Sequence, residues 1–287
     1  AHDGRLIRDG GLENCTHIQY SGRMEAPPPA ALKGRGTPIR IAPRYRRDER
    51  EAVDDGWGPA PDADDGLPRP PATEVREEQV RSLLAANDSP DVPFEWSINP
   101  YRGCEHGCIY CYARPTHAWL DLSPGLDFET RLVAKVNAAE VLQRELARRG
   151  HRPSPVNIGS ATDAYQPVER RLALTRAVLQ VLTACEHPFT IVTKSAGVER
   201  DLDLIAPAAR RGQAAVFVSV TTLDGALARK LEPRAAAPQR RLLAVRRLAE
   251  AGVPVGVNVA PIIPFVNEPE IERIAAAAAA AGASSLH

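Results

Sequence analysis

The sequence lacks any long apolar run and carries no net charge. Its 287 residues contain 36 Lys and Arg against 36 Asp and Glu, so overall charge does not direct the chain toward nucleic acid. No stretch has the roughly 20 consecutive apolar residues that a transmembrane helix needs. No basic segment followed by an apolar one, as in a secretory signal, opens the chain. We therefore expect a cytoplasmic protein with no membrane partner, in which a local basic groove is still compatible with zero net charge.

Cysteine is also scarce. Five cysteines in the whole chain, three of them within one short stretch, do not make a disulfide framework and fit a reducing compartment. Cys15 lies in a polar segment, which indicates a free thiol. Cys185 follows an apolar stretch, and we interpret it as a small buried hydrophobic residue.

The three clustered cysteines form the most informative motif. Cys104, Cys108 and Cys111 are separated by three and two residues in the sequence CEHGCIYC. A [4Fe–4S] cluster is usually bound by four thiolates, so three would leave one iron open to a small molecule, as in a catalytic cluster. The alternative is a structural zinc site completed by His106 or His117. We favour the cluster, because His106 lies inside the loop, where reaching the metal would strain the turn.

The first 90 residues predict an N-terminal arm that is partly disordered or wrapped on the domain that follows. Runs at 26–30 and 58–62 have the Pro, Gly and Ala content of linkers. The arginines at 44–47 are candidates for phosphate contacts, and the alternative is that they only increase solubility. A short helical pattern over 73–84 is expected to dock this arm.

Residues 91–287 predict a single α/β domain. Strands are expected at 96–101, 156–159, 189–193, 215–220 and 253–259, and helices at 128–146, 169–185, 199–211, 224–231, 238–251 and 268–282. Strands rich in β-branched residues that alternate with helices indicate a parallel sheet covered by helices. Repeated right-handed crossovers curve such a sheet into a barrel. We expect a partial (β/α)6 barrel that ends near its sixth strand, around residues 284–287.

Polar residues recur where the expected strands end, which is where β/α barrels place their chemistry. Asp163 follows the second strand, Lys194 follows the third, Ser219 lies in the fourth, and residues 258–262 end the fifth. Beside a metal loop, these side chains supply the carboxylate, ammonium and hydroxyl groups that could hold a zwitterionic amino acid with an attached ribose. For Asp163 and Ser219 the alternative is a helix cap, a common use of Asp and Ser at strand ends.

These motifs resemble a known family. The cysteine motif with Tyr110 before its last cysteine resembles the radical S-adenosylmethionine (radical SAM) superfamily. Other segments between Asn99 and Pro261 are similar to the spore photoproduct lyase and DNA repair photolyase-like branch of that superfamily. They are Val192-Thr193-Lys194, Phe217-Val218-Ser219, Leu231-Glu232-Pro233 with Arg241 further on, and Val259-Ala260-Pro261-Ile262.

The resemblance implies a radical SAM barrel with two cofactors. Cys104, Cys108 and Cys111 would bind a [4Fe–4S] cluster, and S-adenosyl-L-methionine (SAM) would bind beside it. The implied activity is reductive cleavage of SAM to a 5′-deoxyadenosyl radical, with lyase chemistry in DNA repair as the candidate role. The implied partners are a reduced flavodoxin or ferredoxin-type electron donor and DNA.

The resemblance also assigns roles to residues of the SAM site. Tyr110 and Ala260 would contact the adenine, Lys194 would pair with the SAM carboxylate, and Ser219 would bond to the ribose. Asp163 lies where the family has a polar group near the SAM amino group. Each assignment is carried from the motif to the matching position of this sequence.

One position departs from the lyase pattern. In the lyase, a cysteine after the second strand returns a hydrogen atom to the product radical, and the aligned residue here is Ser160. Its O–H bond is too strong for that role, so the same lyase route is doubtful. Tyr112 is the candidate catalytic residue that could relay a radical, and the alternative is that its ring only packs.

Other substrates and functions remain open from the sequence. One alternative is a radical SAM enzyme that acts on a peptide or RNA, and another is a non-catalytic, metal-stabilised nucleic-acid-binding module. A DNA lesion would have to leave the base stack to reach a buried radical. In that case Arg102, Arg114, Arg170 and Arg171 are candidates to line the path of the phosphates.

Overall fold

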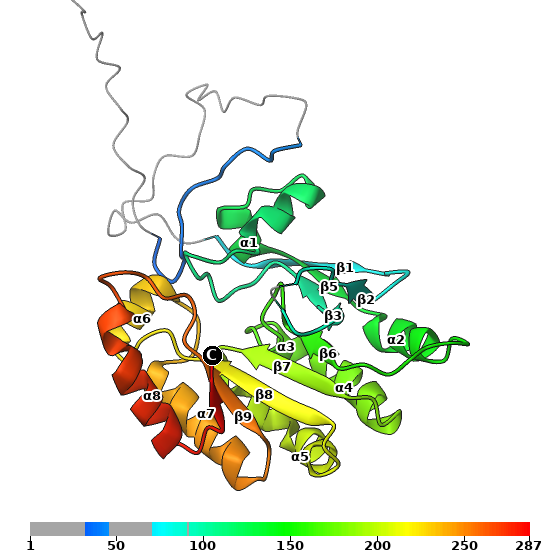
Figure 1. Ribbon diagram of the computed structural model, residues 1–287. Coiled ribbons are helices and arrows are strands. Elements are labelled where there is room, and N and C mark those ends of the chain that lie inside the picture. The colour runs from blue at the N-terminus through cyan, green and yellow to red at the C-terminus, as the bar shows by residue number, and fades with distance from the viewer. Residues whose placement is uncertain (1–31, 46–70, 91) are drawn as a thin grey trace, which may run out of the picture.

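The computed structural model describes residues 32–45, 71–90 and 92–287 (Figure 1). The predictions for Cys15, for the two linker-like runs and for the arginines at positions 46 and 47 concern residues outside these ranges. None of the described helices is long and apolar enough to cross a bilayer.

A seven-stranded sheet forms the centre of the fold. Its order is β10-β9-β8-β7-β6-β3-β2, with every neighbouring pair parallel except the antiparallel pair of β2 and β3. The strands are β2 (Leu84–Ala86), β3 (Trp96–Ile98), β6 (Val156–Ile158), β7 (Phe189–Thr193), β8 (Ala214–Ser219), β9 (Val255–Asn258) and β10 (Ser285–Leu286). The six parallel strands confirm the predicted partial barrel, in which the short β10 is the sixth strand.

The register of this sheet aligns its apolar side chains into one row. Ile98 pairs with Ile158, Ile158 with Ile191, Ile191 with Val216, and Val216 with Val255. All five are at most 1% exposed. Because side chains of a strand alternate between its two faces, this row fixes which face the helices cover.

Helices pack along the outer side of the curved sheet (Figure 1). The longer ones are α2 (Ala138–Leu146), α4 (Leu174–Ala184), α5 (Leu202–Arg210), α7 (Pro238–Glu250) and α8 (Ile271–Ala280). Their buried residues, such as Leu142, Leu182 and Leu248, join the strand residues in one core. Burial of each such side chain contributes about 1.5–3 kcal/mol. The remaining segments are α3 (Glu169–Leu172), α6 (Gly225–Leu231), η1 (Arg114–Leu120), η2 (Ala196–Asp201) and η3 (Glu268–Glu270).

A second, three-stranded sheet corrects two sequence predictions. The expected helix over 128–146 is instead α1 (Leu126–Thr130), strand β5 (Arg131–Lys135) and then α2. The helical pattern expected over 73–84 is instead strand β1 (Glu74–Glu78), followed by β2. β5 lies between β1 and β4 (Tyr101–Arg102). Periodicity over a short apolar run does not distinguish strand from helix, and here the distant pairing partner β1 decides.

Three further differences are local. The expected strand 96–101 is divided into β3 and β4, and the expected helix 169–185 is divided into α3 and α4 at Ala173, whose φ is 52°. Cys185 is exposed rather than buried. It is the C-cap of α4, beyond the last buried residue of the helix, Leu182.

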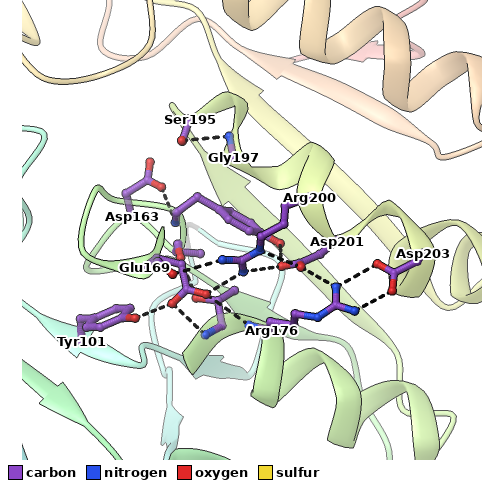
Figure 2. A network of polar contacts seen from close by, with 12 residues as sticks. Tyr101, Asp163, Glu169, Arg176, Ser195, Gly197, Arg200, Asp201 and Asp203 are labelled. Atoms are coloured by element: carbon purple, nitrogen blue, oxygen red, sulfur yellow. Dashed lines mark hydrogen bonds and ion pairs between the residues drawn. The ribbon is translucent and has the colours of Figure 1, made fainter. Parts of the chain in front are cut away.

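A buried polar network joins β4 to the helices beneath the barrel mouth (Figure 2). Glu169 is 1% exposed and accepts hydrogen bonds from the Tyr101 hydroxyl, from Thr175 N at 3.1 Å and from Arg200 Nη2 at 2.7 Å. Arg200 also pairs with the fully buried Asp201 at 2.8 Å. Burial, and then the Glu169 carboxylate, raise the pKa of Tyr101 well above its usual value, so its hydroxyl stays a donor.

This network predicts a specific loss of stability. We expect Glu169→Gln to lower the free energy of unfolding by about 3 kcal/mol, because it leaves charged and polar partners unpaired in a buried site. The measurement is urea denaturation followed by circular dichroism. Asp203→Asn is the matched control: Asp203 pairs with Arg176 at 2.6 Å but is 57% exposed, so we expect a change below about 1 kcal/mol. Equal losses in the two variants would contradict the role of burial.

Candidate functional site

Three free thiols lie on the loop between β4 and η1. Cys104 and Cys108 are buried, and Cys111 is partly exposed. Burial raises the pKa of Cys104 well above its usual value and that of Cys108 to about 12, although the Lys194 ammonium opposes the shift at Cys108. Thiols that ionise with such difficulty become stable thiolates when metal ions supply the positive charge. This donor set fits a thiolate-bound iron–sulfur cluster.

The histidines of the zinc alternative are engaged elsewhere. His106 Nδ1 lies 3.3 Å from the Asp163 carboxylate. His117 is fully buried, bonds through Nε2 to the Arg131 carbonyl at 2.8 Å, and packs edge-on against Phe128. Within the described ranges, no three His, Cys, Asp or Glu residues form a group that could hold one metal ion. The irons of a cluster can each take a different thiolate, so a cluster does not require that convergence.

A buried ion pair supports the loop from below. Arg114 donates through Nε to the Cys108 carbonyl at 2.9 Å and through Nη2 to Glu129 at 2.5 Å. The Glu129 side chain is 0% exposed. Arg114 therefore points inward, which corrects the expectation that it lines a path for phosphates.

The N-terminal strap, residues 32–45, crosses the same loop. Gly36 N donates to Glu129 Oε2 at 2.9 Å, and Arg35 Nη1 donates to the Glu129 carbonyl at 3.0 Å. A Cβ atom added at Gly36 would lie 1.8 Å from the carbonyl oxygen of Gly107, in the middle of the cysteine motif. Only glycine allows this approach.

Two buried charge clusters fix the neighbouring strand ends. The Asp163 side chain, 8% exposed, accepts hydrogen bonds from Thr193 Oγ1 at 2.7 Å, Lys194 N at 2.7 Å and Tyr165 N at 2.8 Å. Burial opposes its ionisation, but His106 and these donors hold the pKa of Asp163 well below its usual value. With both oxygens engaged by the protein, Asp163 joins the cysteine loop to the end of β7.

The second cluster surrounds Tyr110. Its hydroxyl donates to Glu232 and lies 3.1 Å from Thr221 Oγ1. Glu232 also pairs with Arg241, which is 1% exposed. Burial opposes the ionisation of Glu232, but Arg241 and then the Lys194 ammonium keep its pKa below the usual value.

The structure brings most of the predicted SAM-site residues toward this second cluster. Lys194 Nζ lies 5.8 Å from the centre of the Tyr110 ring. Arg241 Nη1 donates to the Ser219 carbonyl at 3.0 Å, and Thr221 Oγ1 donates to the Ala260 carbonyl at 3.3 Å. The Asp163 carboxylate contacts this group by accepting the backbone N–H of Lys194, so it is not free.

Tyr112 lies at a different part of the mouth. Its side chain is 78% exposed, so the packing alternative does not apply, and its hydroxyl donates to the carbonyl of Ser160. Ser160 Oγ in turn accepts from Asn99 Nδ2 at 3.0 Å. The structure thus places Tyr112 beside Ser160.

Sequence reasoning gave no role to several residues that build the site. Glu232 and Arg241 were seen only as parts of matching segments, and Thr221 and Asn99 were not singled out as site residues. The signal for Glu232 was its position between Leu231 and Pro233. A charge in the sequence does not reveal that it will be buried against another charge.

The comparison with protein families decides the classification. The family model of the radical SAM superfamily matches residues 98–278. The chain belongs to the radical SAM superfamily. Among curated relatives, an uncharacterized protein of Mycobacterium tuberculosis is 41% identical over 213 residues, which cover 72% of this chain and 63% of the relative. An uncharacterized protein of Methanocaldococcus jannaschii is 29% identical over 176 residues, which cover 61% of this chain and 63% of the relative.

Solved structures support the radical SAM barrel. A spore photoproduct lyase mutant with bound AdoMet and dinucleoside spore photoproduct has a TM-score of 0.52 and 20% identity, over 71% of this chain and 57% of that one. A second mutant of that lyase has a TM-score of 0.51 with the same identity and coverage. These likenesses concern the fold. This radical SAM chain spans less than two thirds of the length of the relatives and structures named here.

The strap contact generates a prediction for this site. We expect Gly36→Ala to displace the cysteine loop through its clash with Gly107 and to lower the iron retained after anaerobic reconstitution. The measurement is iron and acid-labile sulfide per chain. Gly34→Asn is the control, because a Cβ at Gly34 meets nothing within 4 Å and Asn tolerates its φ of +72°. Equal iron retention in the two variants would show that the strap does not position the loop.

Proposed function

We propose that this protein binds a [4Fe–4S] cluster through Cys104, Cys108 and Cys111 and cleaves SAM reductively. The observation that carries this proposal is the position of Lys194. Its ammonium lies over the Tyr110 ring beside the cysteine loop and forms no ion pair within the described part of the chain. A cation in such a site needs an anionic partner, and the SAM carboxylate supplies one.

When bound, the reduced cluster and SAM supply a 5′-deoxyadenosyl radical, which is the chemistry that the protein itself lacks. The residues of this chain bind and orient. Lys194 holds the carboxylate, Ser219 bonds to the ribose, and Tyr110 and Ala260 contact the adenine. The protonated hydroxyl of Tyr110 is fixed by Glu232, which keeps the ring in one orientation.

The proposed role of Asp163 is to orient the site. It fixes the backbone of Lys194 and the histidine of the cysteine loop, so it sets the spacing between the ammonium and the thiols. Such positioning matters because a misplacement of about 1 Å costs on the order of 100-fold in rate. In this proposal Asp163 lies near the SAM amino group, and its carboxylate orients the Lys194 backbone and His106.

We further propose DNA repair as the physiological task, with a lesion base as the substrate and a reduced flavodoxin or ferredoxin-type protein as the electron donor. The resemblance to spore photoproduct lyase supports this choice, as does the exposed Tyr112 at the mouth. Tyr112 would relay a hydrogen atom where Ser160 does not. A thiolate-bound cluster suits a reducing, cytoplasmic setting.

Anaerobic turnover tests the activity. With dithionite and SAM, we expect the reconstituted brown protein to release 5′-deoxyadenosine, and Cys108→Ala to release none. We expect Lys194→Met to raise the KM for SAM roughly tenfold through loss of a charge-assisted contact. Lys230→Met, on the exposed side of α6, is the control. A colourless zinc protein that forms no 5′-deoxyadenosine would refute the proposal, and deuterium transfer from peptide or RNA but not from DNA would reassign the substrate.

The relay role of Tyr112 has its own test. We expect Tyr112→Phe to lower the amount of repaired DNA formed per 5′-deoxyadenosine released, because the abstracted hydrogen can no longer return through the phenol. Product and 5′-deoxyadenosine are quantified in the same anaerobic reaction. Tyr45→Phe is the matched control, since Tyr45 is 53% exposed and its ring contacts Trp119. An unchanged ratio in Tyr112→Phe would remove Tyr112 from the catalytic residues.

A further inference from the structure

A cavity of ≈ 410 Å³ opens on the rim of the barrel. It lies between the cysteine loop, the loops that follow β6 and β7, and the segment between α6 and α7. Its polar lining comes from His106, Tyr165, Ser195, Arg170, Arg234 and Arg240. None of the residues proposed to hold SAM is in this lining.

The charge of this lining is positive. Arg234 pairs with Glu105 at 3.1 Å, and Arg240 pairs with Glu199. Glu199 is shared with a further arginine, Arg247, at 2.6 Å. Arg170 is exposed and has no carboxylate partner within the described part of the chain. Among the described residues, the three guanidinium groups of the lining therefore have two carboxylate partners. One of these carboxylates, Glu199, also pairs with Arg247 outside the lining.

A hydroxyl donor lies at the same wall. Ser195 Oγ accepts the Gly197 N–H at 3.1 Å, which leaves its own proton for an acceptor in the cavity (Figure 2). Guanidinium groups and a hydroxyl are the donors that bind phosphate oxygens, with arginine favoured by its planar fork. Arg171, the next residue along α3, is exposed but does not line the cavity.

We propose that this cavity binds a phosphate group, with Arg170 as its unpaired cation. The phosphate belongs either to the backbone of a nucleic-acid strand that approaches the barrel mouth or to a free nucleotide. If the phosphate belongs to a nucleic-acid strand, the inference rests on the proposed function and adds to it a fixed contact for the strand beside the cysteine loop.

The wall of the cavity connects this site to the proposed cluster site. Arg234 N donates to the His106 carbonyl at 3.2 Å, and Ala236 N donates to the Lys194 carbonyl at 3.3 Å. One short segment thus carries the cavity arginine and holds both the cysteine loop and the end of β7. A phosphate bound to Arg234 would stabilise the arrangement of both.

Fluorescence anisotropy of the full chain tests the site, with a fluorescein-labelled single-stranded oligothymidylate as the probe. Thymidine 5′-monophosphate and inorganic phosphate serve as competitors. We expect Arg170→Gln to weaken phosphate binding about tenfold, the loss typical of one charge-assisted hydrogen bond. We expect Arg171→Gln, the same charge change one residue away, to weaken binding less than about twofold.

The competitors distinguish the two sources of phosphate. Displacement of the probe by the mononucleotide at similar concentration indicates a nucleotide pocket, whereas displacement by unlabelled oligonucleotide alone indicates a strand contact. Equal effects of the two substitutions, or no binding of any phosphate probe, would overturn the site. SAM cleavage by the wild-type protein is measured separately, without nucleic acid. If Arg170 contributes to phosphate binding but no 5′-deoxyadenosine forms, the phosphate site stands and only the proposed SAM cleavage is refuted.

Discussion

The buried ion pair between Arg114 and Glu129 is the interaction on which the cysteine loop depends. A carboxylate that is 0% exposed is costly to bury, and it is stable here because a guanidinium and the backbone of the N-terminal strap share its charge. The same guanidinium holds the Cys108 carbonyl. Segments far apart in the chain therefore meet under one loop, and the loop takes its shape from them.

Other buried charges around the mouth follow the same rule. Asp163 is satisfied by His106 and by the end of β7, and Glu232 is satisfied by Arg241 and Tyr110. These carboxylates are therefore paired within the protein and join the cysteine loop to the neighbouring strand ends. Within the described part of the chain Lys194 forms no ion pair, although its ammonium lowers the pKa of Glu232, and our proposal assigns it an anionic ligand.

The mouth thus has two cationic regions separated by one segment of chain. Lys194 faces the cysteine loop and Tyr110, whereas Arg170, Arg234 and Arg240 line the cavity on the rim. The net charge of zero does not indicate either cationic region, because it is a sum over all faces of the molecule. In our proposals, the SAM carboxylate binds to the first region and a phosphate group to the second.

Features that depend on neighbouring residues could be predicted from the amino-acid sequence. The β-branched runs such as 189–193 and the alternation of strand and helix are local patterns that predicted the parallel barrel, and the cysteine motif carried the resemblance to the superfamily. Features that depend on pairing or burial between distant residues became visible only in the folded chain. It made 131–135 a strand through β1, turned Arg114 inward toward Glu129, and separated Arg170 from Arg171 at the cavity. The physical reason is that a strand partner or the burial of a charge depends on chain segments that no local pattern records.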